Sequence, residues 1–254
     1  MLSNDQIVSF TKSSNITKNI LQEYLQHELL DSFYKQSGSE NYSFIGGTAI
    51  RIVYGGKRFS EDLDFDTTDL ESFDRILSEV VEDMKYKGFN LEFRLIHKGA
   101  YHCHIKFPKI LQIHGLSGYD EEKLLVKFDA SNTDILYSQK NILNNYGVFQ
   151  TINVAPPSIL LSKKLLTIQS RKRPKGRDLY DVTWLWGMAK PDESYIRSNT
   201  NKDLHTTLQE LLQYVITLDL DDLSKQTSIF LEQSSELSRI LNFPSFIEQK
   251  IKEL

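Results

Sequence analysis

The chain has 254 residues, of which 40% are hydrophobic and 25% charged, and its formal net charge is −4 at pH 7. This composition is ordinary for a globular protein and excludes a disordered or fibrous chain. The length is compatible with one large domain or two modest ones. Because the net charge is negative, contact with nucleic acid would depend on a local basic patch.

The N-terminal residues MLSNDQIVSFTKSS lack the basic start and apolar run of a signal peptide. Elsewhere, no apolar stretch in the sequence approaches the roughly 20 residues that a membrane-spanning helix needs. The single cysteine, Cys103, excludes an intrachain disulfide, which agrees with a reducing compartment. We therefore expect a cytoplasmic protein with no membrane partner.

Helical and strand patterns alternate in the first part of the chain. Apolar residues recur at helical spacing from Asp5 to Tyr34, and the run YSFIGG then predicts a strand that stops at a glycine turn. A short helix should start at Gly47 or Thr48. A longer helix is expected over 69–87 and strands over 90–96, 101–107 and 123–129. This alternation predicts an α/β layer structure with a mixed sheet.

The character of the sequence changes at Pro156-Pro157, after which the pattern is almost entirely helical. We therefore predict an α/β lobe over residues 1–155 and a helical lobe over residues 156–254.

Charged and apolar residues alternate in SEDLDFD, as in a half-buried strand with Leu63 facing the core. Asp62 and Asp64 then project from one face. Two such carboxylates repel each other unless a cation neutralises them, and hard oxygen ligands suit Mg²⁺ or Mn²⁺ bound to a nucleotide's phosphates. The alternative is a solvated edge strand. Asp66 follows Asp64 at the same two-residue spacing, but we expect it beyond the end of the strand, at the surface.

The Gly46-Gly47 pair lies upstream, where a strand meets a helix. Glycine allows a phosphate to approach the backbone, so phosphate and metal sites would adjoin. A simple turn is the alternative.

The segment GGTAIRIVYGGKRFSEDLDFD resembles the signature of AbiEii-type nucleotidyltransferases, which are toxins of bacterial toxin–antitoxin and phage-defence systems in the polymerase β superfamily. The resemblance implies a nucleotide site made of Gly46, Gly47, Thr48, Arg51, Arg58 and Ser60, and metal ligation by Asp62 and Asp64. For each arginine, a structural salt bridge is the alternative, although either can clamp phosphate bidentately.

The superfamily also has a third carboxylate on a neighbouring strand, and KLLVKFDA offers Asp129 for this catalytic position. The alternative is that Asp129 merely caps or solvates a strand end.

A second segment, SKKLLTIQSRKRPKGRDLYDVTWLW, resembles the later half of the family signature. The resemblance assigns catalytic roles to Lys164, Asp178 and Asp181 and nucleotide binding to Arg177. Asp178 and Asp181 are three residues apart in the first turn of a predicted helix, where the macrodipole favours negative charge, so helix stabilisation is the alternative.

Five of the seven residues from Arg171 to Arg177 are basic. This composition is typical of a loop over phosphates, and an acceptor RNA would bind there; a solvated loop without a partner is the alternative.

A zinc site is a further hypothesis, suggested by four histidines: His97, His102, His104 and His114. We reject it because no further ligand has a suitable spacing. We interpret them as surface histidines.

Together, the two motifs predict a Mg²⁺-dependent nucleotidyltransferase that holds an NTP in a cleft between its lobes and transfers an NMP. By the resemblance, the leading acceptor is the tRNA 3′ end and the second a protein hydroxyl, and a cognate antitoxin is expected. The alternatives are a catalytically silent nucleotide- or RNA-binding module and an antibiotic-modifying nucleotidyltransferase.

Overall fold

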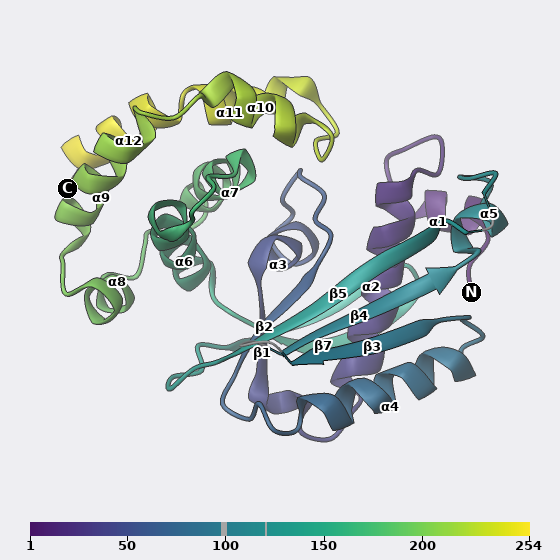
Figure 1. The fold of residues 1–254 in the computed structure, drawn as a ribbon. Helices are drawn as coiled ribbons and strands as arrows, with labels where there is room; N and C mark the ends of the chain where they lie inside the picture. Colours follow the sequence, from purple (N-terminus) through teal and green to yellow (C-terminus); the bar gives the residue numbers. More distant parts are fainter. Residues whose placement is uncertain (98–100, 120) are drawn as a thin grey trace. The chain divides into compact units, whose positions relative to one another are not determined.

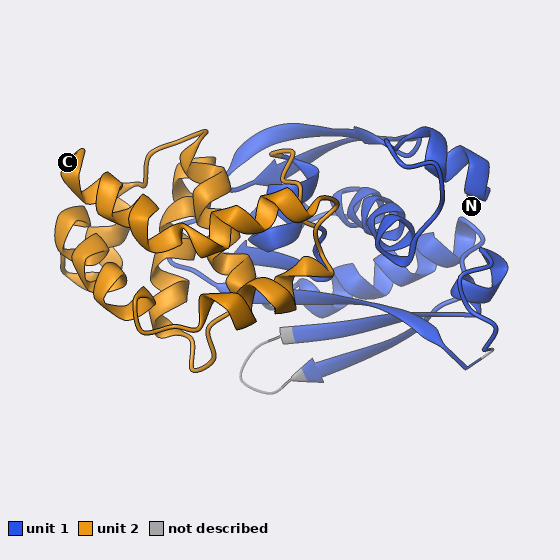
Figure 2. Ribbon diagram, turned by 90° about the horizontal axis from the view of Figure 1, so that it is seen from above, with its two compact units in different colours: residues 1–53, 59–155 blue, residues 54–58, 156–254 orange. Residues whose placement is uncertain are grey.

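The computed structural model describes residues 1–97, 101–119 and 121–254. The chain forms two compact units, the first made of residues 1–53 and 59–155 and the second of residues 54–58 and 156–254 (Figure 2). Residues 54–58 thus group with the second unit, although the chain on either side of them belongs to the first.

The first unit is built on a seven-stranded mixed sheet with the strand order β3-β4-β5-β2-β1-β7-β6 (Figure 1). In its centre, β2 runs antiparallel to β1 and parallel to β5, and β5 runs antiparallel to β4. The strands are β1 (Tyr42–Ile45), β2 (Leu63–Thr67), β3 (Glu92–His97), β4 (Tyr101–Pro108), β5 (Lys123–Asn132), β6 (Gln139–Asn145) and β7 (Val148–Val154).

Helices α2 and α4 cover one face of this sheet (Figure 1). Phe33 of α2 stacks on Phe65 of β2 at a centroid distance of 4.6 Å, and Phe73 of α4 stacks on Tyr42 of β1 at 6.0 Å. The helices of this unit are α1 (Asn4–Ser9), α2 (Lys18–Tyr34), α3 (Gly46–Ile52), α4 (Phe73–Tyr86), α5 (Ile110–Ile113) and the 3-10 turn η1 (Ser39–Asn41).

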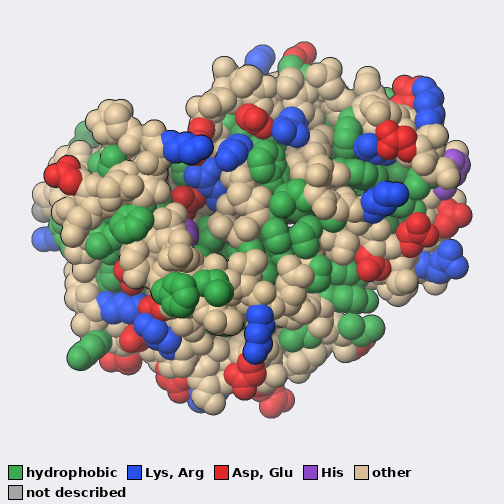
Figure 3. Space-filling model, turned by 180° about the vertical axis from the view of Figure 1, so that it is seen from behind, with side chains coloured by type: hydrophobic (Ala, Val, Ile, Leu, Met, Phe, Trp, Pro, Cys, Tyr) green, Lys and Arg blue, Asp and Glu red, His purple; other side chains and the backbone are tan. Residues whose placement is uncertain are grey.

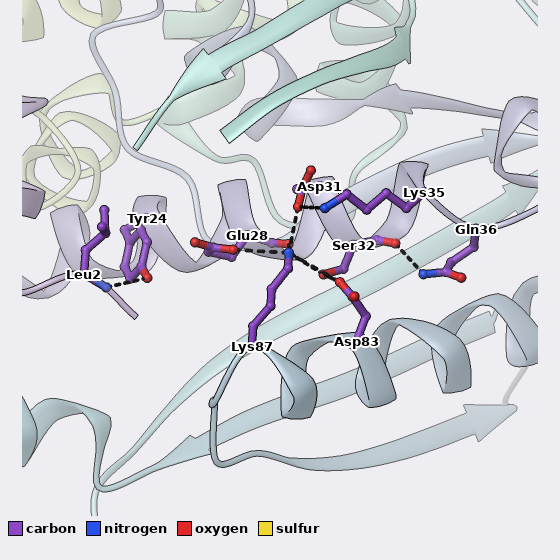
Figure 4. A network of polar contacts seen from close by, with 9 residues as sticks. All are labelled: Leu2, Tyr24, Glu28, Asp31, Ser32, Lys35, Gln36, Asp83 and Lys87. Carbon is purple, nitrogen blue, oxygen red and sulfur yellow. Dashed lines mark hydrogen bonds and ion pairs between the residues drawn. The ribbon is translucent and has the colours of Figure 1, made fainter. Parts of the chain in front are cut away.

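Lys87, just after α4, joins α2 to α4 (Figure 4). Its Nζ lies 2.7 Å from Asp31 Oδ2, 3.2 Å from Glu28 Oε2 and 3.4 Å from Asp83 Oδ2, and it donates a hydrogen bond of 2.9 Å to Ser32 Oγ. One ammonium group therefore neutralises carboxylates from both helices, which fixes the layer that supports the sheet.

The second unit is helical, as predicted. Asp192, Asp203 and Asp219 are the N-caps of three of its helices, each accepting a backbone hydrogen bond. The helices are α6 (Pro157–Ser170), α7 (Gly176–Trp186), α8 (Glu193–Thr200), α9 (Leu204–Val215), α10 (Leu220–Ser228), η2 (Ser234–Leu237), α11 (Ser238–Leu241) and α12 (Phe243–Lys252).

The predicted α/β class with a mixed sheet is confirmed, but one local expectation was wrong and one pair of strands was not predicted. The N-terminal helical pattern forms two helices, because Ser13 and Asn15 hydrogen bond to one another in the break and Thr17 caps the second helix. The hairpin of β6 and β7 was not predicted. Its two-residue turn places both Tyr146 and Gly147 at positive φ, and tyrosine is an uncommon residue there.

On the face shown in Figure 3, Lys and Arg side chains lie interspersed with those of Asp and Glu. On this face, a site for an anion would therefore be a local arrangement of side chains. Within the described residues, no helix combines the length and apolar character that crossing a membrane requires.

Candidate active site

The glycine turn and the acidic strand are packed directly on each other. Gly46 follows β1 with φ of +79°, and a Cβ built there would lie 2.1 Å from Asp64 Oδ2. The antiparallel register that pairs Ile45 with Asp64 produces this approach. Only glycine fits, because any side chain would meet both a strained backbone and the carboxylate. The glycine turn thereby defines where the Asp64 carboxylate lies.

Asp62 is positioned by hydrogen bonds to its segment rather than by the sheet, since β2 begins one residue later, at Leu63. The Thr48 hydroxyl donates to the Asp62 carbonyl. From α2, Gln26 Nε2 donates to the Ser60 carbonyl at 2.9 Å, and Gln22 Nε2 donates to the neighbouring Glu61 carbonyl at 3.0 Å. The Asp62 side chain is half-buried.

Asp66 is placed differently from our expectation of a surface position beyond the strand. It lies within β2, paired with Ser43 and Ser131, and is buried. The strand extends to Thr67 because both of its neighbours, β1 and β5, continue alongside it and supply backbone hydrogen bonds that the local sequence does not reveal.

Asp129 lies beside Asp64, since the parallel pairing of β2 and β5 matches these two residues. The antiparallel pairing of β5 and β4 matches Asp129 with His102. On β5, Leu124, Val126 and Phe128 are buried, so Asp129 projects from the opposite face. Asp64, Asp129 and His102 therefore form one row across three strands, on the face away from α2 and α4.

This row is open to solvent. The Asp129 and His102 side chains are 30% and 35% exposed, and His102 Nδ1 lies 2.5 Å from Asp129 Oδ1. Lys127, two residues before Asp129, has its Nζ 3.9 Å from Asp62 Oδ1. The carboxylates are thus held by partners at their edges while remaining accessible to a ligand.

The other nucleotide-site candidates of the first unit are occupied in structural contacts. Arg51 Nε donates to Glu23 Oε2 at 2.5 Å, and its guanidinium lies 4.1 Å from the centroid of the Phe59 ring. Gly47 and Thr48 are buried within α3, and Ser60 is partly exposed. Their roles toward a nucleotide stay predictions.

Four candidates of the second unit form a buried charge cluster: Arg58, Lys164, Asp178 and Asp181. Arg58 donates to Asp181 bidentately, from Nε to Oδ1 at 3.0 Å and from Nη2 to Oδ2 at 2.8 Å. Lys164 Nζ lies 2.8 Å from both Asp178 Oδ1 and Asp181 Oδ2, and Arg171 Nε lies 3.0 Å from Asp178 Oδ2. We call Arg58, Lys164, Arg171, Asp178 and Asp181 the buried charge cluster, although Arg171, whose side chain is 35% exposed, lies at its edge.

Electrostatics keep Asp181 and Lys164 ionised in this cluster. Burial by itself would raise the pKa of Asp181, but the charges of Arg58 and Lys164 outweigh it and hold that pKa below its ordinary value. Burial would likewise lower the pKa of Lys164, yet Asp181 and Asp178 raise it. The aspartates thus neutralise cations within the unit, and α7 starts without a side-chain cap.

The basic segment 171–177 is only partly exposed. Arg171 belongs to the buried charge cluster, and the Arg177 guanidinium lies 5.9 Å from the Phe230 ring centroid. Lys172 and Arg173 are exposed. A nucleic-acid contact of this segment would therefore use these two side chains first.

Sequence reasoning missed two partners, His102 of Asp129 and Arg171 of Asp178. The sequence predicted surface positions for both His102 and His114. His102 is partly exposed, but the prediction is wrong for His114, which is buried. The His97 side chain lies outside the described residues. The two-residue alternation of a strand could have predicted the face on which His102 lies. It could not have predicted the residues beside it, because strand register cannot be read from one sequence. In the described ranges, no three His, Cys, Asp or Glu side chains gather as a metal-binding group.

The fold resembles two solved structures from Helicobacter pylori. JHP933 has a TM-score of 0.60 and 18% identity, with 94% of this chain and 95% of that chain covered. A protein described as a candidate nucleotidyltransferase has a TM-score of 0.61 and 18% identity, with 94% and 98% covered. Both likenesses show that this chain shares its fold with those two proteins.

The family follows from sequence. A family model described as "Nucleotidyl transferase AbiEii toxin, Type IV TA system" matches residues 28–238, which is most of the chain. The chain belongs to this AbiEii nucleotidyltransferase toxin family, as the two motifs predicted. Comparison with curated protein sequences gave no match.

Proposed function

We propose that the protein transfers an NMP from an NTP to an acceptor hydroxyl, with Asp62 and Asp64 as ligands of a divalent metal. The observation that carries this proposal is the packing of the Asp64 carboxylate on the Gly46 backbone, with Asp129 next to it in register. These partly exposed carboxylates offer the oxygen ligands that suit Mg²⁺ or Mn²⁺. When bound, such a metal neutralises triphosphate charge and stabilises the departing pyrophosphate.

The protein groups have separate tasks in this proposal. Gly46 and Gly47 leave room for a phosphate to approach the backbone. Asp62 and Asp64 orient the triphosphate through the metal, and Asp129 serves the acceptor hydroxyl. Holding both reactants in line removes much of the entropic barrier to the transfer.

For the second motif we propose a positioning role. Asp178 and Asp181 keep Lys164 and Arg58 charged and oriented within the second unit. The nucleotide contacts that the family resemblance assigns to Lys164, Arg58 and Arg177 remain part of the proposal. They predict weaker NTP binding in Lys164→Ala and Arg177→Gln, with binding measured by calorimetry.

For the acceptor we propose RNA, with the tRNA 3′ end first and a protein hydroxyl second. The exposed Lys172 and Arg173 support a polyanionic acceptor. The description of the family as a type IV system supports a cognate antitoxin.

The decisive experiment incubates the protein with each labelled NTP, Mg²⁺, and total tRNA or a protein extract. Label should move to tRNA. Asp64→Asn should lower the rate at least about a hundredfold, because a bound metal supplies several kcal/mol of transition-state stabilisation. Glu92→Gln is the matched control, since Glu92 is an exposed carboxylate on β3 that pairs with Lys123.

The other outcomes separate the rival functions. Label on protein would replace the RNA acceptor, and label on an added aminoglycoside would indicate an antibiotic-modifying enzyme. NTP binding without any transfer would show a silent module. Full activity of folded Asp64→Asn would contradict the metal-site assignment.

A further inference from the structure

Among the described histidine side chains, that of His102 contacts a carboxylate of the candidate site. Its Nδ1 lies 2.5 Å from Asp129 Oδ1, and the strand register places it in one row with Asp129 and Asp64. Both side chains of the pair are about one-third exposed, so the contact forms at an accessible surface. A substrate resting on this row would meet the imidazole as well as the carboxylates.

Other histidines have different surroundings. His27 is buried, with its Nδ1 2.8 Å from the Glu23 carbonyl, and His114 is buried against the side chain of Asn4. His104 lies on the same face of β4 as His102, yet it makes no ion pair with a carboxylate in the part of the chain that the structure describes. His102 is thus distinguished from a neighbour in an otherwise similar position.

The orientation of the ring has a chemical consequence. An imidazole that donates its Nδ1–H to a carboxylate keeps Nε2 as a proton acceptor, and the carboxylate fixes the ring and stabilises the cation that forms. This is the arrangement of a base held by an orienting acid. In His102, Nε2 is on the side of the ring away from Asp129, and the side chain is accessible.

We propose that Asp129 acts through His102, whose Nε2 is the general base for the acceptor hydroxyl. The hydroxyl O–H bond breaks and its proton moves to Nε2, while the oxygen forms a bond to the α-phosphorus of the NTP. The bond from the α-phosphorus to the bridging oxygen breaks, and pyrophosphate leaves with that electron pair. This inference rests on the proposed nucleotidyl transfer and adds a catalytic residue to it.

The test compares His102→Ala with His104→Ala, a matched control two residues away on the same strand face. Loss of a general base should lower kcat about a hundredfold or more and leave KM for the NTP unchanged. Added imidazole should restore part of the kcat of His102→Ala in a concentration-dependent manner. His104→Ala should keep its rate within about twofold, in line with a surface substitution.

A second readout does not depend on activity. In histidine-selective nitrogen NMR, Asp129→Asn should shift the tautomer balance of His102 far more than that of His104, because His102 Nδ1 lies 2.5 Å from this carboxylate, whereas the charge of Asp129 acts on His104 only at longer range. The double variant His102→Ala/Asp129→Asn should be little slower than His102→Ala alone, because both residues serve one step.

Distinct results would overturn the proposal. If His102→Ala keeps its kcat within about threefold while Asp129→Asn loses transfer, Asp129 acts without the histidine. Absence of imidazole rescue in a folded His102→Ala that still binds NTP would also reject the base. These outcomes would not contradict the proposed nucleotidyl transfer, provided that Asp64→Asn is inactive. If the wild-type protein transfers no label, both the nucleotidyl transfer and the role of His102 are wrong.

Discussion

The carboxylates of the two motifs lie in opposite surroundings. Asp62, Asp64 and Asp129 of the first unit are partly exposed, and the contacts described above leave them open to solvent. Asp178 and Asp181 of the second unit are 1% exposed, and each is paired with two cations. The same residue type therefore serves ligand binding in one unit and internal neutralisation in the other.

Burial explains the difference. An exposed carboxylate pays little for its charge in water and can exchange solvent for a metal or a substrate. A buried carboxylate must be compensated within the protein, and removing its partner leaves an isolated charge in a medium of low polarity. A motif match alone does not distinguish these cases, because it identifies residues without giving their exposure.

The largest expected effect on stability is that of Asp181→Ala. The substitution leaves Arg58 buried without its bidentate partner and removes one carboxylate from Lys164. Breaking a buried pair in this way should cost about 3–5 kcal/mol of unfolding free energy, measured by urea denaturation. Glu248→Ala is the control, because its pair with Lys252 is exposed and its loss should change the unfolding free energy little.

The same pair predicts a pH dependence. Because the folded protein holds the pKa of Asp181 below its ordinary value, the pair stabilises the fold fully above that ordinary value. The contribution is lost as the pH falls through the lowered pKa. The difference in unfolding free energy between wild type and Asp181→Asn should therefore become smaller in strong acid. A difference that stays constant from neutral to acidic pH would show that Asp181 is not ionised in the folded protein.

A smaller effect is expected for Gly46→Ala, compared with Gly147→Ala. Both glycines have positive φ, +79° and +77°, but a Cβ at Gly147 meets no atom within 4 Å, whereas one at Gly46 meets Asp64. Gly147→Ala should cost about 1–2 kcal/mol from the backbone alone. Gly46→Ala should cost more and also abolish transfer by displacing Asp64, as measured by thermal unfolding and the labelling assay.

Equal stability losses in the two glycine variants, together with full activity of Gly46→Ala, would show that the Asp64 carboxylate is not held against the turn. The comparison separates the steric contact from the strain of left-handed backbone, which both variants share.

The smallest effect concerns the basic segment 171–177. Lys172→Gln/Arg173→Gln should weaken tRNA binding and reduce the salt slope by about 1–2, because each phosphate contact releases condensed counterions. NTP affinity should stay unchanged. Lys225→Gln, a substitution of an exposed lysine in α10, is the control. If the double variant keeps the wild-type salt slope, Lys172 and Arg173 do not contact the acceptor.

The sequence by itself determined the family, the mixed α/β class and the helical character of the later part. These follow from local information: the glycine pair, the alternating EDLDFD run, and the periodicity of apolar residues. Local chemistry also predicted that Leu63 faces the core, and its side chain is buried. Such patterns involve neighbours in the chain, so one sequence contains them.

Only the tertiary structure decided which candidate residues meet. Strand register placed His102 beside Asp129 and Asp129 beside Asp64, although 27 residues separate the first pair along the chain. Packing within the second unit buried Asp181 against Arg58, a residue 123 positions earlier. Register and burial depend on contacts between distant segments, and a one-residue shift of a strand would reverse its faces. For that reason the sequence could name the carboxylates, while their partners and exposure, and with them their chemistry, came from the fold.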